Sequence, residues 1–206
     1  VAIVASKHDE LLSALRGIAE GTTEVFSPVP KEQLKIAFLF PGQGAQRVGL
    51  LKDLVQRFPA LAKRLREYDE ASQAETGCSL WEALYPSSAT STESAQTFLT
   101  QTHVCQPVMA ALGVSLGELL IDLGVMPDVV LGHSLGEFAA ASIAGMLPGA
   151  DAVRLVAQRG RFMNELGLDD KGAMLAVMAA PSDIEPHISA IASLAVANFN
   201  HPTQVV

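Results

Sequence analysis

The sequence has little of what builds disulfide-rich, metal-binding or membrane-spanning proteins. It contains two cysteines, Cys78 and Cys105, too few for a disulfide framework and without the spacing of metal ligands. The five histidines show no H-x-x-x-H pairing, so we predict no structural metal. No apolar run is expected to reach the roughly 18 to 20 residues that cross a bilayer, since the longest candidate is broken by Asp128, His133 and Glu137.

Positive charge is also scarce. Fourteen lysines and arginines stand against 22 acidic residues, and the net charge is −8. Because nucleic acids and anionic lipids require a basic surface, this balance disfavours both and favours a protein partner or a small substrate. Charged residues from Lys7 to Glu10 interrupt any apolar core near the start, so we predict no signal peptide and a cytoplasmic location.

Apolar residues are plentiful, at 49% of 206 residues, which allows one large domain, or one domain and part of a second. The sequence opens at Val1 without methionine and stops at Val205-Val206, where we expect a strand to begin, so we predict a piece of a longer protein. The Thr-, Ser- and Pro-containing stretch before residue 34 predicts a linker. We expect a linker region (1–34), an α/β subdomain (35–168) and the start of a smaller subdomain (169–206).

Periodicity and turn residues predict helices and strands in α/β order. We expect helices at 8–20, 94–99, 106–123, 138–146, 150–166 and 182–191, two or three more within 50–85, and strands at 36–40, 129–131, 173–178 and 194–199. Ser182 is the expected cap of the last helix.

The strongest chemical signal is Gly132-His133-Ser134-Leu135-Gly136, a G-x-S-x-G sequence between an apolar β-branched run and a small-residue helix. In a nucleophile elbow, a serine stands on a strained strand-to-helix turn, and the next backbone N–H contributes to an oxyanion hole. The two glycines are required where strand and helix backbones pass closely. Such pentapeptides also occur in ordinary loops, and here the flanking residues favour an elbow.

A serine hydroxyl needs a base and donors for the oxyanion. Gly42-Gln43-Gly44 follows the first strand, and we predict the Gln43 N–H as second donor beside that of Leu135; an ordinary tight turn is the alternative. His133 is interpreted as structural, because neighbouring residues at a strand end point in opposite directions.

Four motifs, in this order, closely resemble the acyltransferases of fatty acid and polyketide synthases. They are Phe40-Pro41-Gly42-Gln43-Gly44-Ala45-Gln46, Gln106-Pro107, Gly132-His133-Ser134-Leu135-Gly136-Glu137 and Gln158-Arg159-Gly160-Arg161-Phe162-Met163. The resemblance implies an α/β-hydrolase-like large subdomain with a parallel sheet, then the start of a small ferredoxin-like subdomain, with residues 1–34 matching the end of a ketosynthase-to-acyltransferase linker. Enzymes like these move a malonyl-type group from coenzyme A to their serine and then to the phosphopantetheine thiol of an acyl carrier protein, by a ping-pong mechanism.

The resemblance implies roles for particular residues. Ser134 carries the acyl group, the N–H groups of Gln43 and Leu135 form the oxyanion hole, and Arg159 binds the free carboxylate through its planar guanidinium. Gln106 matches a pocket glutamine. From the residues alone, a solvated helix position remains the alternative for both Arg159 and Gln106. No bound cofactor is implied, since acyl-CoA is a substrate and phosphopantetheine belongs to the carrier protein.

The resemblance also bears on the base and on the substrate. The family's general base is a histidine on the order of a hundred residues after the serine. Neither His187 nor His201 stands in its motif, so we expect the base beyond Val206. Leu135 and Gln101-Thr102 resemble malonyl-selecting rather than methylmalonyl-selecting enzymes, while Cys105 departs from the usual small or hydroxylated residue.

Two other functions remain open: an α/β-hydrolase, such as an esterase or thioesterase with water as acceptor, and a non-catalytic spacer within a megasynthase. The hydrolase gives no reason for Arg159 or for the Gln43 turn. An acidic carrier protein would need a local basic patch for docking, and a solvated helix face is the alternative. The candidate patch consists of Lys52, Arg57, Lys63, Arg64 and Arg66.

Overall fold

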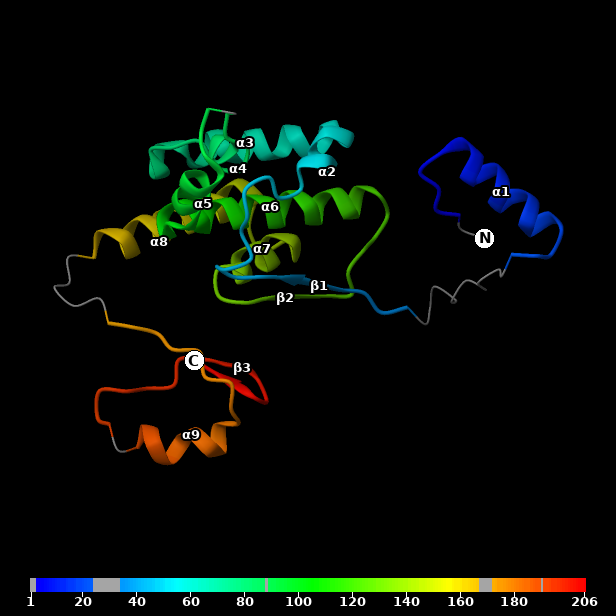
Figure 1. Cartoon of the computed structure of the whole chain (residues 1–206). Helices are drawn as coiled ribbons and strands as arrows, with labels where there is room; N and C mark the ends of the chain where they lie inside the picture. Colours follow the sequence, from blue (N-terminus) through cyan, green and yellow to red (C-terminus); the bar gives the residue numbers. More distant parts are fainter. Residues whose placement is uncertain (1–2, 24–33, 88, 167–171, 190) are drawn as a thin grey trace. The chain divides into compact units, whose positions relative to one another are not determined.

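The computed structural model describes residues 3–23, 34–87, 89–166, 172–189 and 191–206 (Figure 1). Its contacts divide the chain into two units, Val1–Glu165 and Leu166–Val206. The predicted boundary at 168 lies outside the described residues, and most of the stretch that predicts the linker does too. Both boundaries therefore stay predictions.

The first unit contains the predicted α/β order of elements. In chain order these are α1 (His8–Ala19), β1 (Ala37–Phe40), α2 (Lys52–Arg57), α3 (Pro59–Thr76), α4 (Leu80–Leu84), α5 (Thr92–Thr100), α6 (Thr102–Asp122), β2 (Val129–Gly132), α7 (Gly136–Ile143) and α8 (Gly149–Glu165). The main difference is α6, which begins at Thr102 rather than at Gln106 and contains Pro107. Proline normally disfavours a helix interior, and here the burial of the surrounding residues offsets that cost.

Strands β1 and β2 pair in parallel, with Phe40 beside Gly132. The Asp128 carboxylate joins their starting ends, since it accepts the Ile36 N–H over 2.9 Å and the Lys35 ammonium over 3.1 Å. Both interactions lower the pKa of Asp128, and the hydrogen bond from the Ile36 backbone has the larger effect. Because the strands run in parallel and in register, the segments that follow Phe40 and Gly132 leave the sheet at the same edge.

Helix α6 forms the centre of the core, and α3, α7 and α8 pack against it (Figure 1). Its residues from Val104 to Leu112 are buried. By length and composition this 21-residue helix could cross a membrane, which corrects the prediction that no run is long enough. However, 72% of its apolar window is buried inside the protein, as in the core helix of a globular unit.

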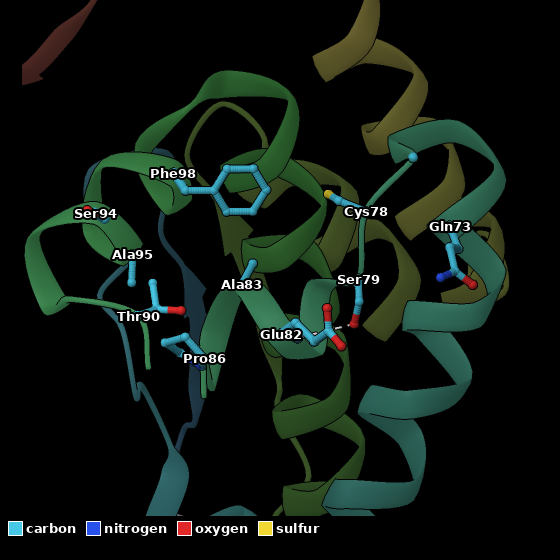
Figure 2. A pocket seen from close by; sticks show the side chains of 11 residues that line it. Gln73, Cys78, Ser79, Glu82, Ala83, Pro86, Thr90, Ser94, Ala95 and Phe98 are labelled. Atoms are coloured by element: carbon cyan, nitrogen blue, oxygen red, sulfur yellow. Dashed lines mark hydrogen bonds between the residues drawn. The ribbon is translucent and has the colours of Figure 1, made fainter. Parts of the chain in front are cut away.

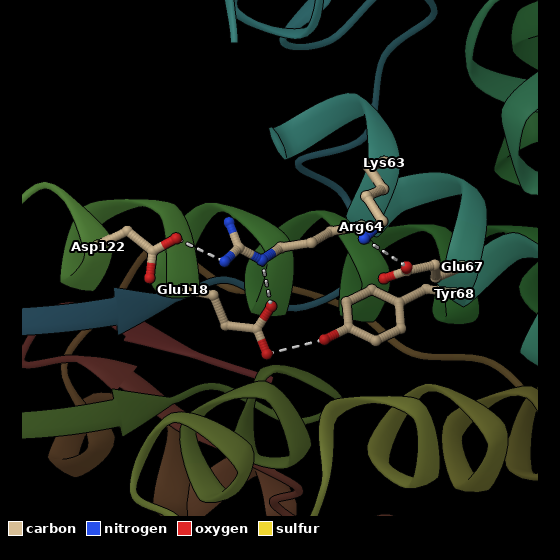
Figure 3. A network of polar contacts seen from close by, with 6 residues as sticks. All are labelled: Lys63, Arg64, Glu67, Tyr68, Glu118 and Asp122. Atoms are coloured by element: carbon tan, nitrogen blue, oxygen red, sulfur yellow. Dashed lines mark hydrogen bonds and ion pairs between the residues drawn. The ribbon is translucent and has the colours of Figure 1, made fainter. Parts of the chain in front are cut away.

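A polar network ties α3 to α6 (Figure 3). Arg64 pairs with Glu118 over 3.1 Å and with Asp122 over 2.6 Å, and the Tyr68 hydroxyl donates to Glu118 over 2.8 Å. Burial, together with the bond to Glu118, raises the pKa of Tyr68. A side chain at Gly149 would collide with the Tyr68 hydroxyl, since a Cβ there would lie 2.3 Å from its oxygen. Glycine therefore lets α8 start directly against α3.

The second unit contains α9 (Pro181–Ile188), β3 (Phe199–His201) and β4 (Gln204–Val205), with β3 and β4 antiparallel. Ser182 does not cap α9, because Ala180 occupies the cap and Pro181, whose fixed φ suits the first turn, begins the helix.

Both strand predictions in this unit need correction. The strand predicted at 173–178 is reduced to one bridge between Val177 and Val205, and the strand predicted at 194–199 begins only at Phe199. An apolar segment forms a strand only where another strand pairs with it. Among the described residues, these two segments pair only at Val177 and near the end of the unit.

Candidate functional site

Ser134 occupies the elbow that the sequence predicts. It lies between the end of β2 at Gly132 and the start of α7 at Gly136, and it is exposed. Its φ is +53°, in the left-handed region that is unfavourable for a residue with a Cβ. Backbone strain of this kind costs on the order of 1–3 kcal/mol and persists only where the surrounding structure imposes it. The turn is therefore held by its neighbours.

The two glycines of the elbow are required by close backbone contacts. A Cβ at Gly132 would lie 2.2 Å from the backbone nitrogen of Glu137 at the start of α7. A Cβ at Gly136 would lie 2.2 Å from the carbonyl oxygen of Phe40 at the end of β1. This confirms the steric reason that the sequence suggests for both positions.

The glycine turn after β1 lies against the elbow. A Cβ at Gly42 would be 2.9 Å from Nδ1 of His133 and 3.5 Å from the Cβ of Ser134. In the part of the chain that the structure describes, neither the Gln43 nor the Leu135 N–H donates a hydrogen bond to another group. The Leu135 side chain is buried in the core, which holds its backbone in place. The structure thus brings both predicted donors to the serine turn.

Arg159 and Gln106, which are far apart in the sequence, form a hydrogen-bonded pair between α8 and α6. Nη1 of Arg159 donates to Oε1 of Gln106 over 2.5 Å, and Nε2 of Gln106 donates to the Met163 sulfur over 3.3 Å. Gln106 is 1% exposed, so the interpretation as a solvated residue at a helix terminus is wrong. Arg159 is half-buried.

Close packing of the two helices makes this pair possible. A Cβ at Gly160 would lie 3.1 Å from the Cα of His103 and 3.5 Å from the Cβ of Gln106. The absence of a side chain at Gly160 therefore lets α8 approach α6 where Arg159 reaches Gln106.

The residue before Gln106 is a buried cysteine. Cys105 is fully buried, and burial raises the pKa of its thiol to about 11, against the opposing effect of a backbone hydrogen bond from Gly44. Cys105 and Gln106 are thus consecutive buried residues of α6, and Gln106 contacts Arg159.

The late histidines lie in the second unit. His201 is exposed on β3, and its Nδ1 lies 2.8 Å from Oγ1 of Thr203 and 3.2 Å from the backbone nitrogen of that threonine. His187 is exposed on α9. The prediction that neither is the base stays a prediction.

Three members of the predicted basic patch are engaged within the first unit. Arg64 pairs with Glu118 and Asp122, and Lys63 pairs with Glu67 over 3.5 Å (Figure 3). The Arg66 guanidinium lies 3.8 Å from the centre of the Trp81 ring. Exposed pairs of this kind are weak, but these contacts compete with binding to a partner. Docking at this patch stays a prediction.

A cavity of about 500 Å³ lies between α3, α4 and α5, with Cys78 and Phe98 in its wall (Figure 2). None of the five predicted site residues lines this cavity. Among the described residues, no group of three or more His, Cys, Asp or Glu side chains could hold a metal ion.

An exposed serine on a strained turn at the carboxyl edge of a parallel sheet defines an α/β protein with the strand–turn–helix geometry of a nucleophile elbow. The sequence profile of the family described as "Acyl transferase domain" matches residues 37–206. The chain belongs to this acyl transferase domain family.

The relatives cover most or all of the chain. It is 39% identical over 208 residues to polyketide synthase GfsA of Streptomyces halstedii, an alignment that covers 100% of this chain and 3% of that protein. It is 34% identical over 177 residues to the malonyl CoA-acyl carrier protein transacylase of Bacillus subtilis (strain 168), covering 84% of this chain and 52% of that one.

The fold agrees with the family. The crystal structure of the acyltransferase domain from the second module of the salinomycin polyketide synthase matches with a TM-score of 0.78 and 37% identity, over 98% of this chain and 46% of that one. The predicted fold class, an α/β-hydrolase-like subdomain followed by the start of a ferredoxin-like one, is confirmed. The chain spans about half the length of that structure and of the Bacillus relative.

Proposed function

We propose that this chain contributes the nucleophile, the oxyanion hole and the carboxylate-binding group of an acyltransferase. The enzyme loads a malonyl-type extender unit from acyl-CoA onto Ser134 and then onto the phosphopantetheine thiol of an acyl carrier protein. The observation that carries the proposal is the Arg159–Gln106 pair, because it fixes a guanidinium on α8, the helix that packs against both α6 and the elbow helix α7. A cation on this helix suits an acyl group that bears a free carboxylate.

In the first half-reaction the Ser134 hydroxyl oxygen attacks the thioester carbonyl carbon, and its proton passes to a general base. The N–H groups of Gln43 and Leu135 donate to the negative oxygen of the tetrahedral intermediate. The carbon–sulfur bond then breaks, and coenzyme A leaves as a thiol that takes the proton. In the second half-reaction the carrier-protein thiol attacks the serine ester, and Ser134 recovers its proton. This order of half-reactions is a ping-pong mechanism.

Arg159 selects the acyl group. Its guanidinium carries five N–H donors, so one bond to Gln106 leaves others for the malonyl carboxylate. The amide of Gln106 restricts the orientation of the guanidinium without neutralising its charge. A malonyl preference over methylmalonyl is part of the proposal, on the resemblance at Leu135 and Gln101-Thr102.

The proposal has three further parts. No histidine among residues 1–206 is assigned as the general base. The chain holds no cofactor permanently. A ketosynthase domain adjoins residues 1–34, and the synthase is cytoplasmic. If His201 is not the base, His201→Ala in the natural full-length protein leaves turnover near the wild-type value. A loss of turnover at unchanged stability would contradict this assignment.

The test is mass spectrometry of the natural full-length protein after incubation with malonyl-CoA. A malonyl adduct on Ser134 that passes to added carrier protein supports the transferase. Rapid release of free malonate without transfer supports the hydrolase, and absence of an adduct supports the spacer. Competition with methylmalonyl-CoA tests the substrate, and preferential methylmalonyl labelling of Ser134 would contradict the malonyl preference.

A further inference from the structure

The loop between β1 and α2 carries the proposed oxyanion donor Gln43, and it contains neither helix nor strand over residues 41–51. Its backbone must therefore be held by other groups. The first of these is within the loop, where the Gly44 N–H donates to the side-chain oxygen of Gln46 over 2.7 Å. This bond fixes the residue directly after Gln43.

A side chain from α5 holds the next part of the loop. Oε1 of Gln96 accepts the Val48 N–H over 3.0 Å, and Nε2 of Gln96 lies 3.5 Å from the Gln46 carbonyl oxygen, to which it donates. One amide thus binds a donor and an acceptor on either side of Arg47. A primary amide suits this task because it offers both a hydrogen-bond donor and a hydrogen-bond acceptor without carrying charge.

Gln96 is itself well anchored. It is half-buried on α5, and Leu99 of the same helix is fully buried in the core. Ala95 and Phe98 line the cavity of Figure 2, while Gln96 bonds to the loop. Beyond Val48, the Gly49 N–H donates to the Leu84 carbonyl over 2.8 Å, so the loop is also fixed at its far end.

We propose that Gln96 is a positioning residue for the oxyanion hole: its amide holds residues 46–48, which through Gln46 and Gly44 keep the Gln43 N–H beside Ser134. This inference rests on the proposed function. Oxyanion donors act because they are oriented before the reaction, and losing one donor costs about 10² to 10³ in rate. If the loop is loosened but keeps its donor, the acylation rate should fall by less, on the order of tenfold.

The experiment compares two variants of the natural full-length protein. Gln96→Met keeps the length of the side chain and removes both hydrogen bonds, whereas Gln96→Glu keeps an acceptor for the Val48 N–H and loses the donor to Gln46. Single-turnover acylation of Ser134 is measured with malonyl-CoA and with acetyl-CoA, together with the KM for each and the melting temperature. Gln56→Met, on the exposed surface of α2, is the matched control.

We expect Gln96→Met to slow acylation about tenfold with both thioesters, with KM nearly unchanged, because the oxyanion forms only in the transition state. Gln96→Glu should fall between Gln96→Met and the wild type, and Gln56→Met should match the wild type. A wild-type rate for Gln96→Met would overturn the inference, as would a selective loss with malonyl-CoA or a rate loss explained by unfolding at the assay temperature. If the wild type itself does not acylate Ser134, the proposed function fails and this inference fails with it.

Discussion

Arg159 donates a hydrogen bond to the buried amide of Gln106, and the other end of that amide donates to Met163. The amide is therefore held in one orientation, with its oxygen toward the guanidinium. Under the proposed function, Gln106 positions the Arg159 guanidinium that binds the acyl carboxylate.

The first prediction concerns Gln106. Gln106→Met should lower the preference for malonyl-CoA over acetyl-CoA by about tenfold, because a hydrogen bond to a charged group contributes about 1.5–3 kcal/mol and 1.4 kcal/mol corresponds to a factor of ten. Gln106→Glu should lower it at least as much, since its carboxylate would compete with that of malonate for Arg159. The ratio of kcat/KM for the two thioesters measures the effect.

Arg154 provides a control on the same helix. It is exposed and pairs with Asp151, so Arg154→Ala should leave the ratio unchanged. Unaltered selectivity in both Gln106 variants would show that the guanidinium does not depend on Gln106 for its position.

The second prediction separates activity from stability at Ser134. Ser134→Ala and Ser134→Gly should both lose malonyl labelling. Ser134→Gly should be more stable than Ser134→Ala by about 1 kcal/mol, because only glycine adopts a φ of +53° without strain. Chemical denaturation measures the difference. Equal stabilities would mean that the turn is not strained in solution.

The third prediction concerns Gly136. Gly136→Ala should destabilise the protein by more than about 3 kcal/mol or prevent folding, because a Cβ there would overlap the carbonyl oxygen of Phe40. Gly145→Ala is the matched control. Gly145 has a φ of +78° with no described atom within 4 Å of an added Cβ, so only the backbone strain of about 1–2 kcal/mol applies. Similar losses in the two variants would argue against the close contact.

The fourth prediction concerns alkaline pH. Burial raises the pKa of Cys105 from its ordinary value near 9 to about 11, so the folded state binds the proton more tightly than the unfolded state. This contribution to stability is complete below pH 9 and is lost as the pH rises through about 11. Unfolding free energies at several pH values from 8 to 11 should therefore decline less steeply in Cys105→Ala than in the wild type. Parallel curves would mean that the thiol does not contribute.

Much of the elbow could be predicted because its signals are local. Gly132, Ser134 and Gly136 lie within five consecutive residues, and the apolar strand before them and the small-residue helix after them are visible in the same stretch. The second unit was predicted less well. Its strands depend on pairing across the unit, as the single bridge between Val177 and Val205 shows, and short apolar runs do not reveal that pairing.

The sequence by itself determined the elbow, the glycine turn and the family, because glycine, proline and motif order act over short distances along the chain. Only the tertiary structure decided that Gln106 is buried and holds Arg159, that most of the predicted basic patch is engaged, and that Gln96 holds the Gln43 loop. These relationships join residues from separate helices and loops. They depend on how closely α5, α6 and α8 pack with their neighbours, which the pattern of any single segment does not contain.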